Sequence, residues 1–499
     1  MSIAGEVDLE RASAIPTRAL TRRALSLGTA NAFDYAMQFL LPVVLARCLE
    51  PGAFGEYRLL WLAVMTVMAV TPLSMPQSLY FFVPRSDGPT RRLYVHQTML
   101  YLAGAGLLAG MALSAWNPLL PQSVHPLTRF GPLVPELVAV WAVAYLLDLL
   151  PTIDERVSWQ ASIVIALSLI RVFGLAAAAL FTGDVRDLIL VLLCVAGIKL
   201  VVLTFYVAKF HGLGRPWLRW RAFTGQIRHA APFGFSSALY ALRVQADQWV
   251  AASLFALQSF AAFSIAAVLG PMINLFRVSV NHAFLPSMSR LQADGDLRGM
   301  LDLNSRANVM VAALAYPLLA FAFVFAEDVV SLIYTSAYLE AAPVMRVYIA
   351  SLAAFVVEVV SIMLLLKEGA FSLRLNLLVF VLSAAMSWLG AHHFGLPGAA
   401  AGSTIAIYVD RIATLMRISK RTGIAFHRLQ DWKTLGLLLL FASMAAVAAR
   451  VVAYHFIAPD AVFTRLLVGG ATLAATYTLL PPLLGHGRAW LLSHCLPGR

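Results

Sequence analysis

Residues His229 to Leu291 read HAAPFGFSSALYALRVQADQWVAASLFALQSFAAFSIAAVLGPMINLFRVSVNHAFLPSMSRL. The stretch contains two apolar segments separated only by residues 256–259, and each is long enough for a membrane span of about 20 apolar residues. Arg243 and Asp247 lie in the first segment, and Arg277 lies in the second. A charge at the centre of a spanning helix costs roughly 2.5–3.5 kcal/mol on insertion scales, so such charges usually face a bundle interior or a water-filled cavity. We therefore expect these two helices to form part of a cavity wall.

An earlier window of the chain has the same layout, displaced by 206 residues. Residues 45–49 fall on 251–255, and residues 54–57 (FGEY) fall on 260–263 (FAAF). Both windows have the pattern of a helix end, a tight turn of small residues with an aromatic pair, and a new helix. Compositional likeness between apolar helices is the alternative explanation, because the identity is weak. We expect an internal duplication, since many transporters are built from repeats with substrate bound between them.

The composition places the chain in a membrane. Of its 499 residues, 60% are hydrophobic and only 12% are charged, and the mean hydropathy is +0.79. Soluble globular chains carry roughly 25% charged residues, so the sequence predicts an all-α polytopic membrane protein. The net charge of +12 suits cytosolic loops near anionic lipid. Nucleic acid is not an expected partner, because the cations are spread over many short loops.

Fourteen transmembrane helices are expected, with gaps too short for a soluble domain. They lie near residues 24–46, 57–82, 93–115, 133–151, 159–181, 188–208, 230–256, 260–283, 308–326, 343–366, 375–391, 397–416, 434–456 and 463–484. Repeats that begin at the first and seventh helices predict two six-helix lobes. Because six is even, both lobes would insert with the same orientation, related by a pseudo-two-fold axis along the membrane normal. The expected parts are a cytosolic tail (1–23), an N-lobe (24–209), a cytosolic basic linker (210–229), a C-lobe (230–420), and helices 13 and 14 with the C-terminal tail (421–499).

The loop charges indicate an orientation for these helices. If the N-terminus is cytosolic, the segments on the cytosolic side hold 25 Lys and Arg residues, and those on the outer side hold 4. Cytosolic loops carry an excess of Lys and Arg in membrane proteins. One helix too few or too many would place every later loop on the opposite side of the membrane and mix the charges. The observed split therefore supports both the helix count and cytosolic N- and C-termini.

Several motifs resemble the polysaccharide and O-antigen flippases, a family of bacterial inner-membrane proteins within the multidrug/oligosaccharidyl-lipid/polysaccharide exporter superfamily. The resemblance covers about residues 24–420, and its strength lies in the order and spacing of individually weak motifs. They are LARCLEPGAFGEYRLLWLAV (45–64), DQWVAASLFALQSFAAFSIAAVL (247–269), AFLPSMSRL (283–291), YTSAYLEAAPVMRV (334–347) and GLPGAAAGSTIA (395–406).

The resemblance implies a transporter that moves an oligosaccharide repeat unit on a polyprenyl diphosphate carrier from the cytosolic to the periplasmic leaflet. The product would serve O-antigen, capsule or exopolysaccharide assembly, with membrane lipid and a polysaccharide polymerase and chain-length regulator as partners. The family's two lobes enclose a cavity lined mainly by helices one, two, seven and eight. Alternating access of the two lobes would carry the substrate across.

Eight of the 37 Lys and Arg residues fall within the expected helices when Arg465, at the start of the last one, is counted with the outer side. The candidates for binding an anionic substrate are Arg243, Arg277, Arg171 and Lys199. Arginine suits phosphate because its planar fork donates two parallel hydrogen bonds. Structural alternatives remain for each residue. Arg243 and Asp247 are four residues apart and can neutralise each other. Arg277 can snorkel to the cytosolic side, and Arg171 and Lys199 can pair within the first lobe. Asp410 is a doubtful partner for Arg411, because adjacent helix positions face different ways.

Carboxylates inside the expected helices are candidates for coupling transport to a proton or sodium gradient. Asp34 is the first choice, because it lies mid-helix with no basic neighbour at helical spacing, and a structural hydrogen-bonding role is its alternative. Asp247 and Glu358 are the other two candidates.

Enzymatic functions are disfavoured by the motifs. The chain has no G-x-x-x-x-G-K-[ST] and no H-E-x-x-H sequence. Its three cysteines are far apart, so neither a zinc site nor a disulfide framework is expected, and no cofactor is expected. A polysaccharide polymerase or ligase would usually carry a large periplasmic loop, whereas the longest expected outer loop is residues 116–132. An ion-coupled drug or cation antiporter of the same superfamily is the nearer alternative, although it would favour an acidic cavity.

Overall fold

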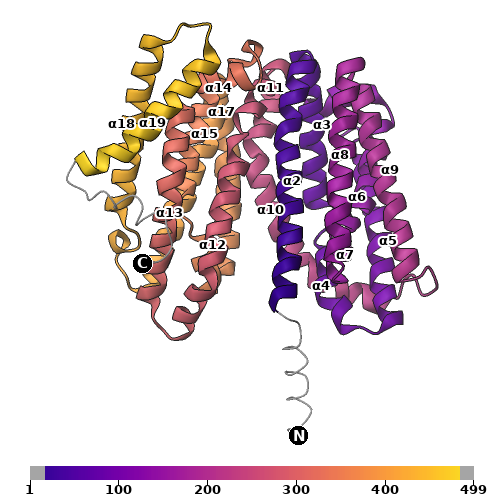
Figure 1. The fold of residues 1–499 in the computed structure, drawn as a ribbon. Coiled ribbons are helices and arrows are strands. Elements are labelled where there is room, and N and C mark those ends of the chain that lie inside the picture. The colour runs from indigo at the N-terminus through magenta and orange to yellow at the C-terminus, as the bar shows by residue number, and fades with distance from the viewer. Residues whose placement is uncertain (1–16, 484–499) are drawn as a thin grey trace. The chain divides into compact units, whose positions relative to one another are not determined.

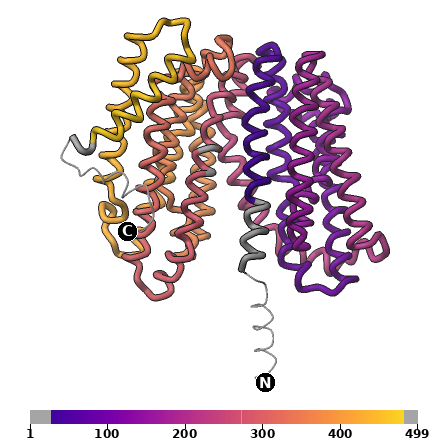
Figure 2. The backbone as a smooth tube through the Cα atoms, viewed as in Figure 1, coloured from indigo at the N-terminus to yellow at the C-terminus, as the bar shows by residue number. Residues whose placement is uncertain are grey.

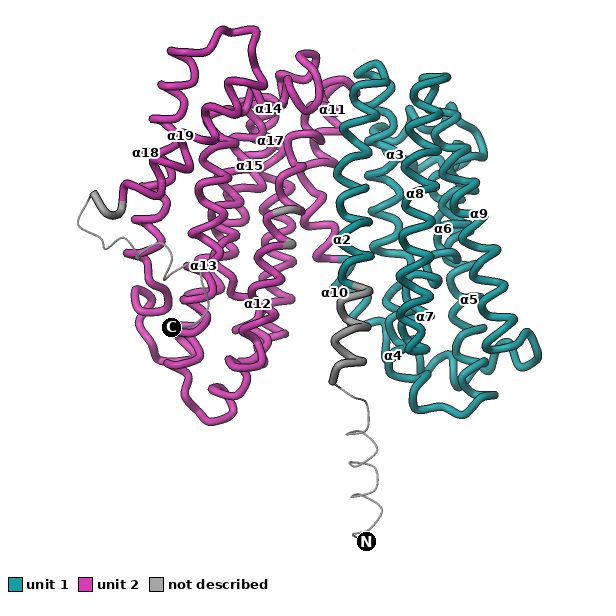
Figure 3. Tube along the Cα trace, in the orientation of Figure 1, with its two compact units in different colours: residues 1–238 teal, residues 239–499 magenta. Residues whose placement is uncertain are grey.

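The chain is all-helical in the computed structural model, which describes residues 17–483 (Figure 1). Within that range, the side chains of residues 17–27, Met272, Leu275 and residues 481–483 lie outside the description, and both ends of the chain beyond it are drawn in grey (Figure 2). No strand occurs among the described residues. The chain divides into two compact units, residues 1–238 and 239–499 (Figure 3).

Unit 1 contains the first six expected spans. Its helices are α2 (Thr17–Cys48), α3 (Pro51–Val70), α4 (Met75–Phe82), η1 (Val83–Arg85), α5 (Gly88–Ala112), η2 (Gln122–Phe130), α6 (Leu133–Ala144), η3 (Tyr145–Asp148), α7 (Leu150–Ile153), α8 (Val157–Phe181) and α9 (Val185–Phe210). The second span is divided into α3 and α4, and the fourth into α6, η3 and α7. Helix α2 packs against α8, α8 against α9, α9 against α6, and α6 against α5.

Unit 2 contains the remaining eight spans. Its helices are α10 (Trp220–Leu254), which begins in unit 1, α11 (Leu257–Ala266), α12 (Leu269–Ala293), α13 (Leu297–Val324), α14 (Ala326–Ile333), η4 (Ser336–Tyr338), α15 (Ala341–Phe355), α16 (Val360–Leu365), α17 (Gly369–Thr422), η5 (Phe426–Arg428), α18 (Trp432–Phe456) and α19 (Val462–Leu483). The eighth span is divided into α11 and α12, and the tenth into α15 and α16. Two pairings of unit 1 recur: α13 packs against α15 as α5 packs against α6, and α15 packs against α17 as α6 packs against α9.

These elements confirm the predicted all-α polytopic fold. Nine helices in the described part of the chain are long and apolar enough to cross a membrane. That number is below fourteen because α17 joins two spans, the tenth span is divided into short helices, and α2, α5 and α10 are not among the nine. The divided spans are the second and fourth of unit 1 and the corresponding eighth and tenth of unit 2, as a duplication would produce.

Helix α17 is two expected spans joined at a kink. Its 54 residues would be far longer than a bilayer requires, but Gly395 has φ 65° and ψ −147°, which ends one arm and starts the next. Glycines let the two arms approach closely: a Cβ on Gly398 would lie 2.0 Å from the Gly390 carbonyl oxygen, and one on Gly402 would lie 2.1 Å from the Ser387 nitrogen. Small residues at such contacts allow membrane helices to pack backbone to backbone.

The break in the second span lies at residues 71–74. Pro72 cannot donate a backbone hydrogen bond, and Leu73 and Ser74 adopt left-handed conformations with φ 42° and 56°. Helix α10 meets this break at Gly234, where a Cβ would lie only 2.4 Å from the Leu73 carbonyl carbon. The absence of a side chain at Gly234 therefore permits the contact.

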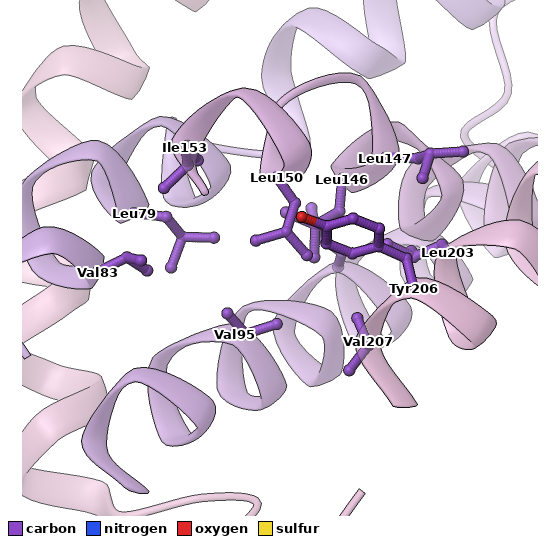
Figure 4. Packing of buried hydrophobic residues seen from close by; sticks show 11 residues of the cluster. Leu79, Val83, Val95, Leu146, Leu147, Leu150, Ile153, Leu203, Tyr206 and Val207 are labelled. Atoms are coloured by element: carbon purple, nitrogen blue, oxygen red, sulfur yellow. The ribbon is translucent and has the colours of Figure 1, made fainter. Parts of the chain in front are cut away.

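A hydrophobic cluster surrounds the break in the fourth span (Figure 4). Its members come from α4, η1, α5, η3, α7 and α9, and they are Leu79, Val83, Val95, Leu102, Leu146, Leu147, Leu150, Ile153, Leu203, Tyr206 and Val207. The Tyr206 hydroxyl donates to Asp154 at 2.8 Å, and a ring nitrogen of His211 lies 2.8 Å from the same carboxylate oxygen. This packing fixes the end of the span from which Asp148 projects.

The start of α10 differs from the expected boundary. The helix begins at Trp220, so half of the segment predicted as a linker (210–229) is helical, and the boundary between the two units falls after Ala238, inside α10. Gln226 explains this early start. Its buried amide accepts from Gln97 at 2.6 Å and donates to Ser78 and Thr98 at 2.8 and 2.9 Å, which ties the first turns of α10 to α4 and α5.

Helices α18 and α19 pack against each other and against α13 of unit 2. A buried ion pair joins Arg465 of α19 to Asp328 of α14 at 3.1 Å. The Tyr454 hydroxyl of α18 donates to the same carboxylate at 2.8 Å. The last two spans are therefore anchored to unit 2 by polar as well as apolar contacts.

Candidate functional site

Unit 1 contains a polar cavity of ≈ 550 Å³. That volume lies within the range of ligand pockets, about 300–1,000 Å³. Helices α2, α3, α4, α8 and α9 and the broken fourth span line it. Its charged and polar lining includes Asn31, Asp34, Gln38, Asp148, Gln160, Ser168, Arg171 and Lys199. Three of the residues predicted from the sequence, Asp34, Arg171 and Lys199, thus lie in one cavity.

Asp34 is held by three donors. Arg171 Nη2 of α8 lies 3.0 Å from its Oδ1, Gln38 Nε2 donates to its Oδ2 at 2.6 Å, and the Ser168 hydroxyl also donates to Oδ1. Asp34 therefore has a cationic partner, although α2 offers no basic residue at helical spacing. The partner is Arg171 of α8, 137 residues away. Arg171 is therefore paired within the first lobe, which is the structural alternative considered for it, and it also lines the cavity.

Lys199 is paired within the first lobe as well. Its ammonium lies 2.6 Å from Asp148 Oδ2 and 5.7 Å from the centre of the Trp141 ring. Asp148 is the last residue of η3, where the fourth span is broken, and Gln160 donates to its carbonyl oxygen at 3.0 Å. The break thus presents a carboxylate to the cavity. Sequence position alone placed Asp148 near a span end and gave no indication of this contact.

Unit 2 contains a second cavity of ≈ 390 Å³, between α10, α12, α15 and α17. Arg243, Asp247 and Arg277 line it, so residues 229–291 do supply a cavity wall. The other polar lining residues are Tyr240, Gln248, Asn274, Tyr348, Ser351, Ser383 and Ser403.

Arg243 and Asp247 do not neutralise each other. Arg243 makes a two-pronged contact with Asp410 of α17, at 3.2 and 3.4 Å, and donates to Asn376 Oδ1 at 2.5 Å. Asp247 instead accepts from the Tyr348 hydroxyl and from the Gln248 backbone N–H, each at 2.8 Å. The sequence reasoning missed these contacts with Asp410, Asn376 and Tyr348, because no spacing along α10 points to residues on α15 and α17.

Arg277 of α12 forms an ion pair with Glu358 and donates to Asn274 at 2.6 Å. Glu358 occupies the break between α15 and α16. Its Oε1 accepts the backbone N–H groups of Val360 and Ser361 at 2.8 and 3.2 Å, so one carboxylate caps α16 and holds Arg277. With only 8% of its surface exposed, Arg277 is buried, and it does not snorkel.

Arg411 also lies in this region, with 6% of its surface exposed. Its guanidinium carbon is 4.8 Å from the centre of the Phe355 ring, and Phe355 lines the cavity. Among the described residues, no group of three or more His, Cys, Asp or Glu side chains could hold a metal ion.

The sequence model of the family described as lipid II flippase MurJ matches residues 133–467. The chain belongs to the MurJ family. The matched range includes every lining residue of the unit 2 cavity and part of the unit 1 cavity. The match begins at α6 and extends through α18 into the start of α19, so this MurJ-family chain matches its family beyond α17.

Solved structures show the same fold at low sequence identity. A lipid II flippase MurJ in an inward closed conformation is 13% identical, with a TM-score of 0.67 over 92% of this chain and 99% of that one. A mutant of the Vibrio cholerae MATE transporter VcmN is 12% identical, with a TM-score of 0.55 over 83% and 99%. A MOP superfamily transporter from Pyrococcus furiosus is 12% identical, with a TM-score of 0.52 over 80% and 95%. No curated protein sequence matches the chain.

These findings confirm the superfamily that the sequence motifs indicated. MurJ and MATE proteins are transporters, so the chain belongs to a transporter family and not to an enzyme family. Its multi-pass membrane character is likewise that of its family.

Proposed function

We propose that this MurJ-family protein flips a polyprenyl-diphosphate-linked saccharide from the cytosolic to the outer leaflet of a bacterial inner membrane. Such a ligand must carry a hydrated sugar and a diphosphate across about 30 Å of hydrocarbon. The transporter therefore needs a polar interior with cations. The family match over residues 133–467 supports lipid-linked flipping in general, and that range contains Arg171, Lys199, Arg243 and Arg277 in their cavities.

The saccharide is the finer part of the proposal. The sequence motifs favour a surface-polysaccharide repeat unit, for O-antigen, capsule or exopolysaccharide, with a polymerase and a chain-length regulator acting after the flippase. The printed name of the matching family is that of a lipid II flippase, so lipid II is the competing substrate. Both carry a saccharide on a lipid diphosphate, and guanidinium groups in the cavities would bind the part they share.

Alternating access between two conformations would move the ligand, with the N- and C-termini in the cytosol. Flipping a charged headgroup without ATP requires another driving force, and we propose an ion gradient acting through a cavity carboxylate. Asp34 is the leading candidate, because a carboxylate that accepts from Arg171, Gln38 and Ser168 can exchange partners when it binds a cation or proton. Asp247 and Glu358 remain the other candidates.

The decisive experiment is depletion of the protein in its native host, followed by analysis of lipid-linked intermediates in each leaflet. The proposal expects lipid-linked repeat units to accumulate on the cytosolic side and the surface polymer to be lost, while growth continues. Accumulation of lipid II with cell lysis would assign the peptidoglycan precursor instead. A depleted strain that keeps both polymers and becomes sensitive to cationic drugs would replace the flippase by a drug antiporter; a similar solved structure is that of a multidrug resistance MATE family transporter.

Purified protein in proteoliposomes separates flipping from its driving force. Fluorescent undecaprenyl-diphosphate-linked sugar should move between leaflets only when the protein is present, and an imposed ion gradient should shift its final distribution. Movement to the same final distribution with and without a gradient would leave a passive scramblase and remove the coupling from the proposal.

A further inference from the structure

The loop between α9 and α10 carries cations that lie outside both cavities. Residues 211–219 separate the two helices, and they extend sideways from the end of α9 (Figure 1). The stretch 209–228 holds five Lys and Arg residues and no Asp or Glu. Arg215, Arg219 and Arg221 are exposed, and none of them belongs to an ion pair in the described part of the chain. Their charges are therefore available to an external anion.

Contacts with α5 hold this loop in place. The Arg92 Nε–H donates to the His211 carbonyl oxygen at 2.6 Å. A ring nitrogen of the buried His96 lies 3.0 Å from the Gly212 carbonyl oxygen, and the same ring stacks on Trp217 with 4.2 Å between the ring centres. A loop fixed in this way presents its arginines as a preformed group, so binding requires little further ordering.

The same contacts place the loop beside the polar end of α5. His96 is the ninth residue of that helix, about 12 Å along the axis from its first residue. Residues 99–112 of α5 contain no charged residue, whereas Arg91 and Arg92 precede His96. The loop therefore packs against α5 where the helix changes from polar to apolar. In a spanning helix this change marks the level of the lipid headgroups.

The loop also exposes large apolar side chains. Residues 213–221 read LGRPWLRWR; Trp220 is 69% exposed, and Leu213 and Leu218 are each 49% exposed. Water contact with such side chains is unfavourable. Tryptophan is instead enriched at the membrane surface, where its ring lies among the headgroups, and neighbouring arginines reach the phosphates. Exposed apolar and cationic residues in alternation are therefore the composition of an interfacial segment.

We infer that residues 213–221, the basic loop, bind the headgroups of anionic phospholipids at the cytosolic membrane surface. The carboxylate that meets the start of the loop, Asp154, is already held by Tyr206 and His211. Phospholipid phosphates would supply the missing counter-charge, since guanidinium groups donate to phosphoryl oxygens in pairs. Each cation near an anionic membrane surface contributes about fivefold in affinity. This role does not depend on which ligand the protein transports.

A second loop on the same predicted side of the membrane provides a matched control. Residues 290–306 hold three exposed arginines, Arg290, Arg298 and Arg306. They also hold three aspartates and no tryptophan. Replacing these three arginines removes as much charge as replacing the three of the basic loop, but it leaves the basic loop unchanged.

The test measures lipid selectivity beside the basic loop of the full-length protein. In a background without the native cysteines, Leu213→Cys carries a bimane fluorophore. The protein is placed in phosphatidylcholine nanodiscs that contain increasing shares of spin-labelled phosphatidylglycerol or spin-labelled phosphatidylcholine. Because the spin label lies near the glycerol in both lipids, quenching reports which lipid occupies the surface of the loop.

Phosphatidylglycerol should be preferred over phosphatidylcholine by roughly 10-fold to 100-fold, given three cations near the lipid phosphates. The triple variant Arg215→Gln, Arg219→Gln and Arg221→Gln should lose this preference. The control triple variant Arg290→Gln, Arg298→Gln and Arg306→Gln should keep it. If the first triple variant does not yield monodisperse protein, Arg219→Gln alone should lower the preference about fivefold.

Three results would overturn the assignment. Equal quenching by the two lipids in the parent protein would mean that the loop does not select anionic headgroups. An equal loss of preference in both triple variants would mean that net charge alone attracts the lipid. No quenching by either lipid would place the loop away from the membrane, with an acidic soluble partner as the remaining ligand for its arginines. The transported ligand is not measured, so each of these results leaves the proposed function intact.

Discussion

Arg243 and Asp247 lie one turn apart on α10, yet each has a partner on a different helix. Arg243 contacts Asp410 of α17 at 3.2 Å, and Asp247 accepts from Tyr348 of α15 at 2.8 Å. Helical spacing would pair Arg243 with Asp247, but the two side chains instead connect α10 to α17 and to α15. This relationship determines which substitutions should compensate each other.

A charge swap between Arg243 and Asp410 should restore stability, and one between Arg243 and Asp247 should not. Arg243→Asp alone should destabilise the protein by roughly 3–5 kcal/mol, because it leaves Asp410 without its cation. Adding Asp410→Arg should recover most of that loss, whereas adding Asp247→Arg should deepen it. Thermal unfolding of the purified variants in detergent measures the difference. Recovery with the Asp247 swap instead would contradict the observed pairing.

Asp34→Asn should slow transport and leave insertion unaffected. The amide keeps the size of the side chain and can still accept from Ser168, but Arg171 loses its counter-charge. If Asp34 carries the coupling, the variant should also lose its response to an ion gradient in proteoliposomes. Asp148→Asn is the comparison, because it removes the partner of Lys199 in the same cavity. A full gradient response in Asp34→Asn, at any transport rate, would remove the coupling assignment.

Acidification should weaken the contact between Glu368 and α17. The Arg421 and Arg417 guanidiniums donate to the Glu368 carboxylate, and they hold its pKa below the usual 4.5. Because the pKa is depressed in the folded state, the stabilisation is fully present above pH 4.5 and is lost as the pH falls towards the folded-state pKa. Glu368→Gln should therefore remove part of the fall in melting temperature between neutral pH and pH values below 4.5. An unchanged profile would mean that the contact does not contribute.

Gly234→Ala should destabilise the break in the second span. Its Cβ would lie within 2.4–2.6 Å of the Leu73 backbone, and such overpacking typically costs about 1–3 kcal/mol. Gly225→Ala is a matched control on the same helix, because the Cβ that it adds would have nothing within 4 Å, and alanine favours the helix there. Melting temperatures should fall for the first variant and stay level or rise for the second. Equal melting temperatures would mean that α10 does not approach the break so closely.

The predicted orientation can be checked by cysteine labelling. In a background where Cys48, Cys194 and Cys495 are replaced by Ser, His125→Cys and Asp460→Cys should react with a membrane-impermeant maleimide added outside. Arg215→Cys should react only after the membrane is permeabilised. The physical reason is the excess of Lys and Arg on the cytosolic segments. Labelling of positions 125 and 215 from the same side would contradict the helix count between them.

The class of fold and the approximate positions of most spans can be predicted from the amino-acid sequence alone. Long apolar segments can lie in a bilayer only as helices, since every backbone polar group must be satisfied within the segment. For that reason α8, α9 and α18 appear close to where the hydropathy placed them. The same reasoning identified the cavity charges, because an ionisable residue in the middle of an apolar span is too costly to keep without a polar environment.

Only the tertiary structure decided the partners of those charges. Asp34 meets Arg171 from 137 residues away, and Arg243 meets Asp410 from 167 residues away. Spacing along one helix reports only contacts three or four residues apart, so neither pairing has a local signal. The breaks that present Asp148 and Glu358 were likewise not predicted from the sequence. Arg411 is a further case: its adjacent carboxylate, Asp410, contacts Arg243 of α10 instead.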